Sequence, residues 1–129
     1  GCVDMANFGP IATVPQQFRE SNRLFYEWNP AVTLMRTNPD ENRQMGEIFA
    51  RKANESKGPR AFLIPLKGVS ILDRDGERFC DREADQAMFD AIRSNVRSDI
   101  RVIEIEANIN DPAFSAKAVE MMLELIEQA

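Results

Sequence analysis

The sequence of 129 residues contains no histidine and only two cysteines, Cys2 and Cys80. The absence of histidine excludes Ser-His and Cys-His nucleophile pairs and imidazole ligands for metals, and we predict no metal site. Two cysteines without a CxxC motif do not make a disulfide framework, so a reducing compartment, the cytoplasm, is expected. Any chemistry must therefore use carboxylates, lysine, arginine, hydroxyls or a thiol without an imidazole partner.

Long apolar runs are also missing. No run approaches the roughly 18 residues of a membrane span, and no signal peptide is recognisable, so no membrane association is predicted. The net charge is −5, and an acidic chain does not attract nucleic acid or an acidic membrane surface. What the sequence does contain is 43% hydrophobic and 29% charged residues, which is typical of a soluble globular domain with a real core.

Five short segments have the β-branched, aromatic or continuous apolar composition of strands. The run RAFLIPL is apolar throughout, which suits a buried parallel strand better than a helix. In the run IRVIEIEA, the isoleucines Ile103 and Ile105 face one way and the intervening glutamates the other, which indicates an edge strand. The expected strands are 2–8, 24–28, 32–36, 60–66 and 100–107.

Three helices are expected among these strands. Asn38, Pro39 and Glu41 have the spacing of a capping box with proline at the first helical position, and Gly58-Pro59 ends that helix. Asp81 caps a second helix to about residue 97, and a third begins at Pro112 with Asp111 as its N-cap. The apolar residues at helical spacing, expected to face the core, are Met45, Ile48, Phe49 and Ala53, then Met88, Phe89, Ile92 and Val96, then Phe114, Ala118, Met121, Met122, Leu125 and Ile126.

From residue 32 onward the order of elements is β-α-β-α-β-α, which predicts parallel strands joined by right-handed crossovers. We therefore expect residues 1–129 to form a single α/β domain. Its architecture would be a mostly parallel open sheet with flanking helices, one half of a Rossmann-like or flavodoxin-like three-layer fold. In such sheets ligands bind beyond the carboxyl ends of the strands, so the loops that follow the strands are predicted to share one rim.

Two of these loops carry a cation. Arg36 lies just before a helix N-terminus, where free N–H groups favour an anion; the alternative is that it pairs with a local carboxylate such as Asp40. Lys67, Gly68 and Ser70 combine a cation, a flexible glycine and a hydroxyl after a buried strand, and such a loop can wrap a phosphate or carboxylate. This loop lacks the GxxxxGK[ST] pattern of the P-loop, and an ordinary turn is the alternative.

The stretch NINDPAF, residues 108–114, follows the last expected strand. Helix-start chemistry accounts for Asp111 and the proline after it. The same chemistry does not account for Asn108 and Asn110, whose amides are predicted either to read a hydroxyl or amide of a ligand or to hold the turn by side-chain bonds to the backbone.

These loops also carry a resemblance that covers nearly the whole chain. The motifs are DMANFGP, NPAVTLMRT, PLKGVSILD, DREADQAMFDAI and NINDPAF, in this order. Together they resemble bacterial and fungal proteins related to the tomato mosaic virus resistance protein, which are often labelled ATP-binding. The resemblance implies a protein of two α/β subdomains, of which this chain is the C-terminal part of the second and the missing N-terminal subdomain is a partner.

The family's glycine- and threonine-rich phosphate loop belongs to the first subdomain. ATP is therefore expected only for the full-length protein, with no cofactor held within this chain. Where the family often has histidine, this chain has Trp28 and Asn108. The matching motif positions, predicted as ligand-binding residues, are Asp4, Asn7, Asn29, Arg36, Lys67, Gly68, Ser70, Asn110 and Asp111.

For the parent protein, the favoured hypothesis is a domain that binds a small anionic metabolite or nucleotide at the rim. For this chain in isolation, the favoured hypothesis is a structural fragment with no activity of its own that needs the missing half. No catalytic constellation is recognisable, so the sequence leaves open whether the protein is an enzyme. The alternative is a protein-interaction or dimerisation module without catalytic activity, because the plant relative acts by binding a viral replication protein and the loop 9–23 offers a partner surface. A homo-oligomer is expected in either case.

Overall fold

The computed structural model describes residues 3–128, so Cys2 lies outside the described residues. Every strand and long helix expected from the sequence is present, with ends that differ by a few residues. The segment 9–23, expected to be a loop, contains two short helical turns. The elements are β1 (Met5–Phe8), the 3-10 turn η1 (Ile11–Thr13), α1 (Gln16–Arg19), β2 (Phe25–Asn29), β3 (Val32–Arg36), α2 (Pro39–Glu55), β4 (Ala61–Pro65), α3 (Arg82–Asn95), β5 (Arg101–Ile105) and α4 (Pro112–Glu127).

The strands form two sheets. Strands β4 and β5 pair in parallel, with α3 in the connection between them, as the β-α-β order predicts. Strands β1, β3 and β2 form a separate sheet in that order, and both of its pairings are antiparallel. The α/β class with flanking helices is thus confirmed, while parallel pairing is confined to β4 and β5.

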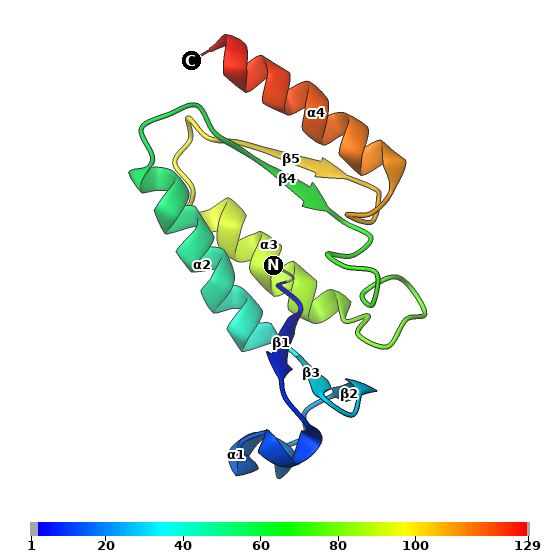
Figure 1. The fold of residues 1–129 in the computed structure, drawn as a ribbon. Helices are drawn as coiled ribbons and strands as arrows, with labels where there is room; N and C mark the ends of the chain where they lie inside the picture. Colours follow the sequence, from blue (N-terminus) through cyan, green and yellow to red (C-terminus); the bar gives the residue numbers. More distant parts are fainter. Residues whose placement is uncertain (1–2, 129) are drawn as a thin grey trace.

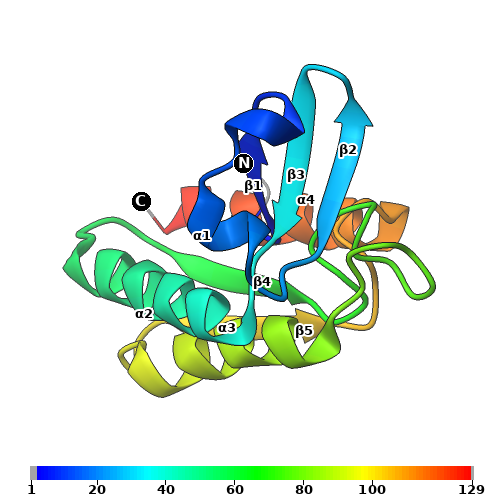
Figure 2. The ribbon, with the colours of Figure 1, turned by 90° about the horizontal axis from the view of Figure 1, so that it is seen from below.

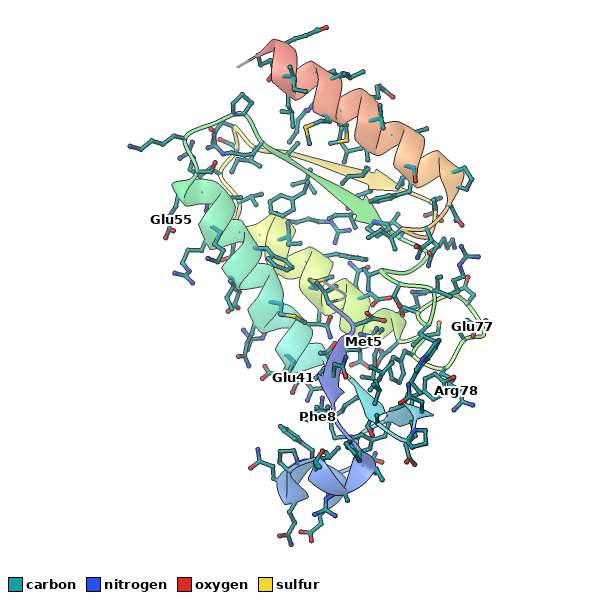
Figure 3. All side chains as sticks on the ribbon, viewed as in Figure 1. Met5, Phe8, Glu41, Glu55, Glu77 and Arg78 are labelled. Carbon is teal, nitrogen blue, oxygen red and sulfur yellow. The ribbon has the colours of Figure 1, made fainter. Side chains whose placement is uncertain are left out.

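The short link between β2 and β3 explains why these two strands pair in an antiparallel way. Only Pro30 and Ala31 separate the two strands, and a connection this short joins antiparallel neighbours, whereas parallel neighbours need a crossover of a dozen residues or more. Asn29 Oδ1 accepts a hydrogen bond of 2.8 Å from the Ala31 N–H and so closes the turn. Figure 2 shows this hairpin standing away from the β4–β5 pair.

Helices cover the β4–β5 pair on both faces (Figure 1): α2 and α3 lie together on one face and α4 lies on the other. The core between the sheet and the α2–α3 pair is built on Ile64 of β4 and on Met88, Phe89 and Ile92 of α3. The three residues of α3 belong to the apolar face predicted for that helix, and all three are buried. This half of the core is therefore confirmed.

The deepest face of α2 differs from the predicted one. Its buried residues are Asn42, Gly46 and Ala50, whereas Ile48 is 41% exposed. The reason is close helix packing, because a Cβ on Gly46 would lie 2.5 Å from the backbone oxygen of Met88. The contact of α2 with α3 is made by a polar amide and two small residues. A search for large apolar residues at helical spacing does not find such a contact.

The predicted apolar face of α4 is only partly buried. Met121 is buried, but Met122 and Ile126 are 58% and 62% exposed. The prediction that these last two residues face the core is wrong. The reason is geometric: α4 covers a sheet of only two strands, so one side of the helix has something to pack against and the rest faces outward.

Candidate functional site

The loops that follow β4 and β5 lie side by side and form what we call the rim, residues 66–70 and 107–111. Their backbones are joined by hydrogen bonds from the Lys67 N–H to the Ala107 carbonyl, 3.1 Å, and from the Ile109 N–H to the Gly68 carbonyl, 3.0 Å. The carboxyl ends of neighbouring parallel strands meet at one edge of a sheet. The rim thus brings together Lys67, Gly68, Ser70, Asn110 and Asp111.

Asn108 holds the rim together. Its side chain is 3% exposed, and its Nδ2 donates to the carbonyl oxygens of Ser70 at 2.8 Å and Lys67 at 3.2 Å. Its Oδ1 accepts from the N–H of Asn110 at 3.0 Å. Of the two roles that the sequence left open for Asn108, the structure gives it the one of holding the turn.

Asp111 occupies the N-cap position of α4, but its carboxylate does not cap the helix. Oδ2 accepts instead from the Asn108 N–H at 2.8 Å, and Oδ1 accepts from Arg74 at 2.9 Å. The predicted start of the helix is confirmed, and the predicted capping by this side chain is wrong because the carboxylate turns back into the rim.

Gly68 has a φ of +118°, a conformation that residues with a Cβ rarely adopt. A Cβ there would also lie 2.5 Å from the carbonyl oxygen of Asp73 and 2.8 Å from Nδ2 of Asn108. The absence of a side chain at Gly68 therefore lets this part of the rim pack directly against Asp73 and Asn108. Its flexibility was predicted as a way to wrap a ligand, and here the freedom of its backbone serves close packing.

A pocket of about 490 Å³ opens beside the rim, and we call it the Trp28 pocket. Its wall is mostly apolar, and its polar side chains are Ser70 and Asn110, one from each rim loop. Trp28 is 60% exposed and stacks edge-on against Tyr26, with ring centroids 5.8 Å apart. The lining residues are Met5, Trp28, Leu34, Val69, Ser70, Ile71, Leu72, Ile109 and Asn110.

A second, polar hollow of about 220 Å³ is lined by Lys67, Arg74, Asp75, Asn108 and Asp111, and we call it the Lys67 hollow. Both of its cations are half-exposed and have a carboxylate partner, Lys67 with Glu106 at 3.3 Å and Arg74 with Asp111 at 2.9 Å. Nε of Arg74 is buried without a hydrogen-bond partner among the described residues. A buried donor without a partner is rare in folded proteins.

Arg36 lies at the centre of a buried ion cluster that we call the Arg36 hub. The residue is 4% exposed, and its Nη2 donates to Asp85 at 2.8 Å and to Asp73 at 3.2 Å, while Nε donates to the Phe79 carbonyl at 2.7 Å. The sequence predicted the anion of a ligand at Arg36, and the structure pairs Arg36 instead with two carboxylates of the protein itself. Asp40, the partner named as the alternative, pairs with an exposed arginine of α2 instead.

The hub contains a second cation and a carboxyl group with a raised pKa. Arg82 donates to Asp85 at 2.6 Å. Burial raises the pKa of Asp73 to about 7, and the neighbouring Asp85 adds to this rise, whereas the bond from the Val69 N–H and the charge of Arg36 oppose it. Asp73 thus takes up a proton near neutral pH, and the hub fastens β3 to α3 and to the loop after β4.

Asp4 and Ser70 form a buried pair between the hub and the Trp28 pocket. The Ser70 hydroxyl donates to Oδ2 of Asp4 at 2.5 Å and accepts from the Asp73 N–H at 3.2 Å. Asp4 is fully buried, and its Oδ1 has no hydrogen-bond partner among the described residues. A hydroxyl has one donor and two acceptor positions, so Ser70 retains one acceptor position for a ligand.

Two predicted site residues belong neither to the rim nor to the buried groups around Arg36 and Asp4. Asn29 is exposed and closes the β2–β3 turn, and Asn7 is exposed on β1, opposite Leu34 of β3. Neither side chain lines the Trp28 pocket or the Lys67 hollow. Among residues 3–128 no three carboxylates or thiols gather in a way that would hold a metal ion, and no helix is both long and apolar enough to cross a membrane.

Comparison with known sequences identifies the family. The sequence model of the C-terminal domain of uncharacterised protein family UPF0261 matches residues 1–126. The chain belongs to the UPF0261 family. It is 48% identical over 127 residues to a UPF0261 protein of Mesorhizobium japonicum and 40% identical over 129 residues to one of Clostridium tetani. It is also 35% identical over 129 residues to the ToMV resistance protein Tm-1(GCR237) of Solanum lycopersicum.

The matched region is a minor part of these UPF0261 relatives. The alignments cover 97% to 99% of this chain but 31% of each of the two bacterial proteins and 17% of the tomato protein. The chain therefore spans about a third or less of the length of the curated relatives it matches. The resemblance found from the sequence motifs is confirmed, including the C-terminal position of the domain.

Sequence reasoning missed several residues of this UPF0261 site. Asp73 and Asp85 were not singled out, although they complete the Arg36 hub, and Arg74 was not connected with the rim. Each is a charged residue in a loop or a helix start, where most such residues are solvated. The only signal available for Asp73 was its place in the quoted motif PLKGVSILD. Trp28 was noted only as a departure from the family pattern, but it lines the pocket.

Proposed function

We propose that this domain binds a small anionic metabolite or nucleotide at the rim, with the apolar body of the ligand in the Trp28 pocket. The observation that carries the proposal is the convergence of one polar side chain from each rim loop, Ser70 and Asn110, on a single apolar pocket of about 490 Å³. Small-molecule sites are commonly apolar clefts of roughly 300–1,000 Å³ with a few placed polar groups.

Hydrogen-bond capacity narrows the class of ligand. Ser70 already donates its proton to Asp4, so toward the pocket it accepts, and the group it recognises is a hydroxyl or an amine. Asn110 donates one of its two amide hydrogens to Oδ1 of Asn108 at 3.2 Å, which leaves the second hydrogen as a donor and its own amide oxygen as an acceptor. The pocket wall therefore selects a ligand with a hydroxyl or amino group on an apolar or planar body.

The anionic part of the ligand belongs on the other side of the rim. Lys67 and Arg74 line the Lys67 hollow, and Nε of Arg74 has no partner among the described residues. An anion there would compete with Glu106 and Asp111 for these cations. A nucleotide, with a planar base, sugar hydroxyls and phosphates, combines all of these features and is the first ligand class to test.

Trp28 provides the test, because it is the only tryptophan of the sequence. Titration of residues 1–129 with ATP, AMP and small phosphorylated hydroxy acids is expected to change its fluorescence, with calorimetry on the full-length protein as the second measurement. Lys67→Ala is expected to weaken binding about tenfold, by the loss of one charged contact. Ser70→Ala is expected to weaken it by a similar factor.

Lys57→Ala is the matched control, because this exposed lysine follows α2 and lies before β4, at the opposite end of that strand. Binding to the control is expected to equal that of the wild type. If neither the domain nor the full-length protein binds any of these compounds, or if Lys67→Ala and Lys57→Ala bind equally well, the proposal is wrong.

A protein-interaction module is the second candidate, and the outer side of α4 favours it. Val119, Met122, Leu123 and Ile126 are 57% to 62% exposed there, an amount of apolar surface on one helix that is usual for a contact with another protein or domain. Light scattering of residues 1–129 across a range of concentrations tests for self-association. A monomer at all concentrations would count against a dimerisation module.

A further inference from the structure

The β4–β5 sheet has one edge that the described residues leave open. Strand β4 pairs with β5 on one side only, and within residues 3–128 no strand pairs with its other side. Yet β4 has the composition of an interior strand, with no charged or polar residue from Ala61 to Pro65. Edge strands usually carry charged residues that prevent further pairing, and β4 carries none.

Backbone geometry identifies the atoms at this edge. The Leu66 N–H donates to the Ile105 carbonyl at 2.9 Å, and because strand residues alternate in direction, Phe62 and Ile64 also face β5. The N–H and carbonyl groups of Ala61 and Leu63 therefore face the open edge. Pro65 has no N–H at the next position on that side, which is where proline is tolerated in a sheet.

A hollow of about 330 Å³ lies along this edge. Four consecutive residues of β4, Phe62 to Pro65, line it. Because successive side chains of a strand point to opposite faces, a hollow that touches all four lies beside the strand and not on one face. Val3 lines the same hollow, and its entire wall consists of apolar residues. An apolar hollow next to unpaired strand backbone is the shape that an added strand would fill.

The helix layer is wider than the sheet it covers. Helices pack about 8–10 Å apart and neighbouring strands lie about 4.8 Å apart, so a pair of packed helices covers roughly four strands. Here α2 and α3 are packed together over one face of only two strands (Figure 1). Phe49 of α2 lines the hollow beyond β4, so the helix layer extends past the open edge.

We propose that the open edge of β4 receives a β-strand from the part of the longer protein that lies outside these 129 residues. The chain spans about 31% of its bacterial relatives, so the longer protein has ample sequence to supply the strand. The added strand would hydrogen-bond to Ala61 and Leu63, stop at Pro65, and place apolar side chains in the hollow. The ligand site proposed above plays no part in this inference.

Hydrogen exchange on the full-length protein tests the proposal, and β4 contains its own control. The amides of Phe62 and Ile64 bond to β5 in any case, so they are slow. We expect hydrogen exchange at the amides of Ala61 and Leu63 to be slowed on the order of a hundredfold or more, because each amide would be hydrogen-bonded in a sheet interior. The extent of slowing should be similar to that at Phe62 and Ile64. This protection is expected to be independent of protein concentration.

Two results would overturn the proposal. If Ala61 and Leu63 exchange freely while Phe62 and Ile64 are protected, the edge is open in the full-length protein. If Ala61 and Leu63 become protected only as concentration rises, in step with a doubling of mass by light scattering, a second copy of the chain occupies the edge instead.

Discussion

The Arg36 hub and the outer side of α4 reverse the usual placement of residues. In the hub, Arg36, Asp73 and Asp85 meet in the interior and are each no more than 4% exposed, while the second arginine, Arg82, pairs with both aspartates from a half-buried position. On α4, Met122 and Ile126 face outward. Charge is thus buried in one region while apolar surface is exposed in the other.

The difference shows which parts of the domain are complete within 129 residues. Every carboxylate of the hub has a cation partner from the same chain, so the hub requires nothing from outside. The outer side of α4 and the open edge of β4 have no such partners among the described residues. The hub is therefore complete within the described residues, and the uncovered surfaces are where we propose contacts with another part of the longer protein or with a partner.

Removal of the central cation of the hub is expected to have the largest effect. Arg36→Met leaves Asp73 and Asp85 buried with less compensating charge and should lower the free energy of unfolding by about 3–5 kcal/mol, as for other broken buried ion pairs. Urea denaturation measures the change. Arg43→Met, which breaks two exposed ion pairs on α2, is the control and should cost less than about 1 kcal/mol. Equal losses of unfolding free energy in the two variants would mean that the hub stabilises the fold no more than exposed ion pairs do.

A substitution in the rim comes next. Gly68→Ala forces a side chain into a positive-φ position and against the Asp73 carbonyl, and such strain costs about 1–3 kcal/mol. Gly58→Ala has no heavy atom within 4 Å of the new Cβ and should be near neutral. Thermal unfolding of the two variants compares them. A similar melting temperature for both would show that the rim is less tightly closed than the structure indicates.

The raised pKa of Asp73 makes the contribution of the hub to the free energy of unfolding depend on pH. Because its pKa rises from 3.8 to about 7 on folding, the native state holds an additional proton between these values, and stability from this group is lost as pH rises through about 7. We expect Asp73→Asn to reduce the fall in unfolding free energy between pH 4.5 and 8, measured by urea denaturation. An unchanged slope in the variant would assign the pH dependence to other groups.

The smallest effect is expected on the outer side of α4. The double substitution Met122→Lys with Ile126→Lys should change the stability of residues 1–129 by no more than about 0.5 kcal/mol, whereas Met121→Ala on the buried side should cost about 2–5 kcal/mol. Denaturation of the three proteins makes the comparison. A large cost for the double lysine variant would mean that this side is covered within the domain, which contradicts the contrast with the hub.

The sequence was a good guide where local chemistry determines structure. The Asn38–Glu41 capping box and the Asp81 cap form as predicted, because caps depend on residues three positions apart. The rim was predictable because β-α-β order brings the ends of β4 and β5 together. What the sequence did not reveal depends on contacts between distant residues, such as the Gly46–Met88 approach and the pairing of Arg36 with Asp73 and Asp85.

The hub also has a consequence for the time course of folding. The bond between Arg36 and Asp85 joins residues 49 positions apart. A ribosome that adds about 5–20 residues per second needs roughly 2.5–10 seconds to make the intervening chain. During that interval the β2–β3 hairpin carries a cation without its permanent partner. The antiparallel sheet is therefore synthesised before the carboxylates that fasten it, and the Arg36–Asp85 bond forms only once the start of α3 has emerged.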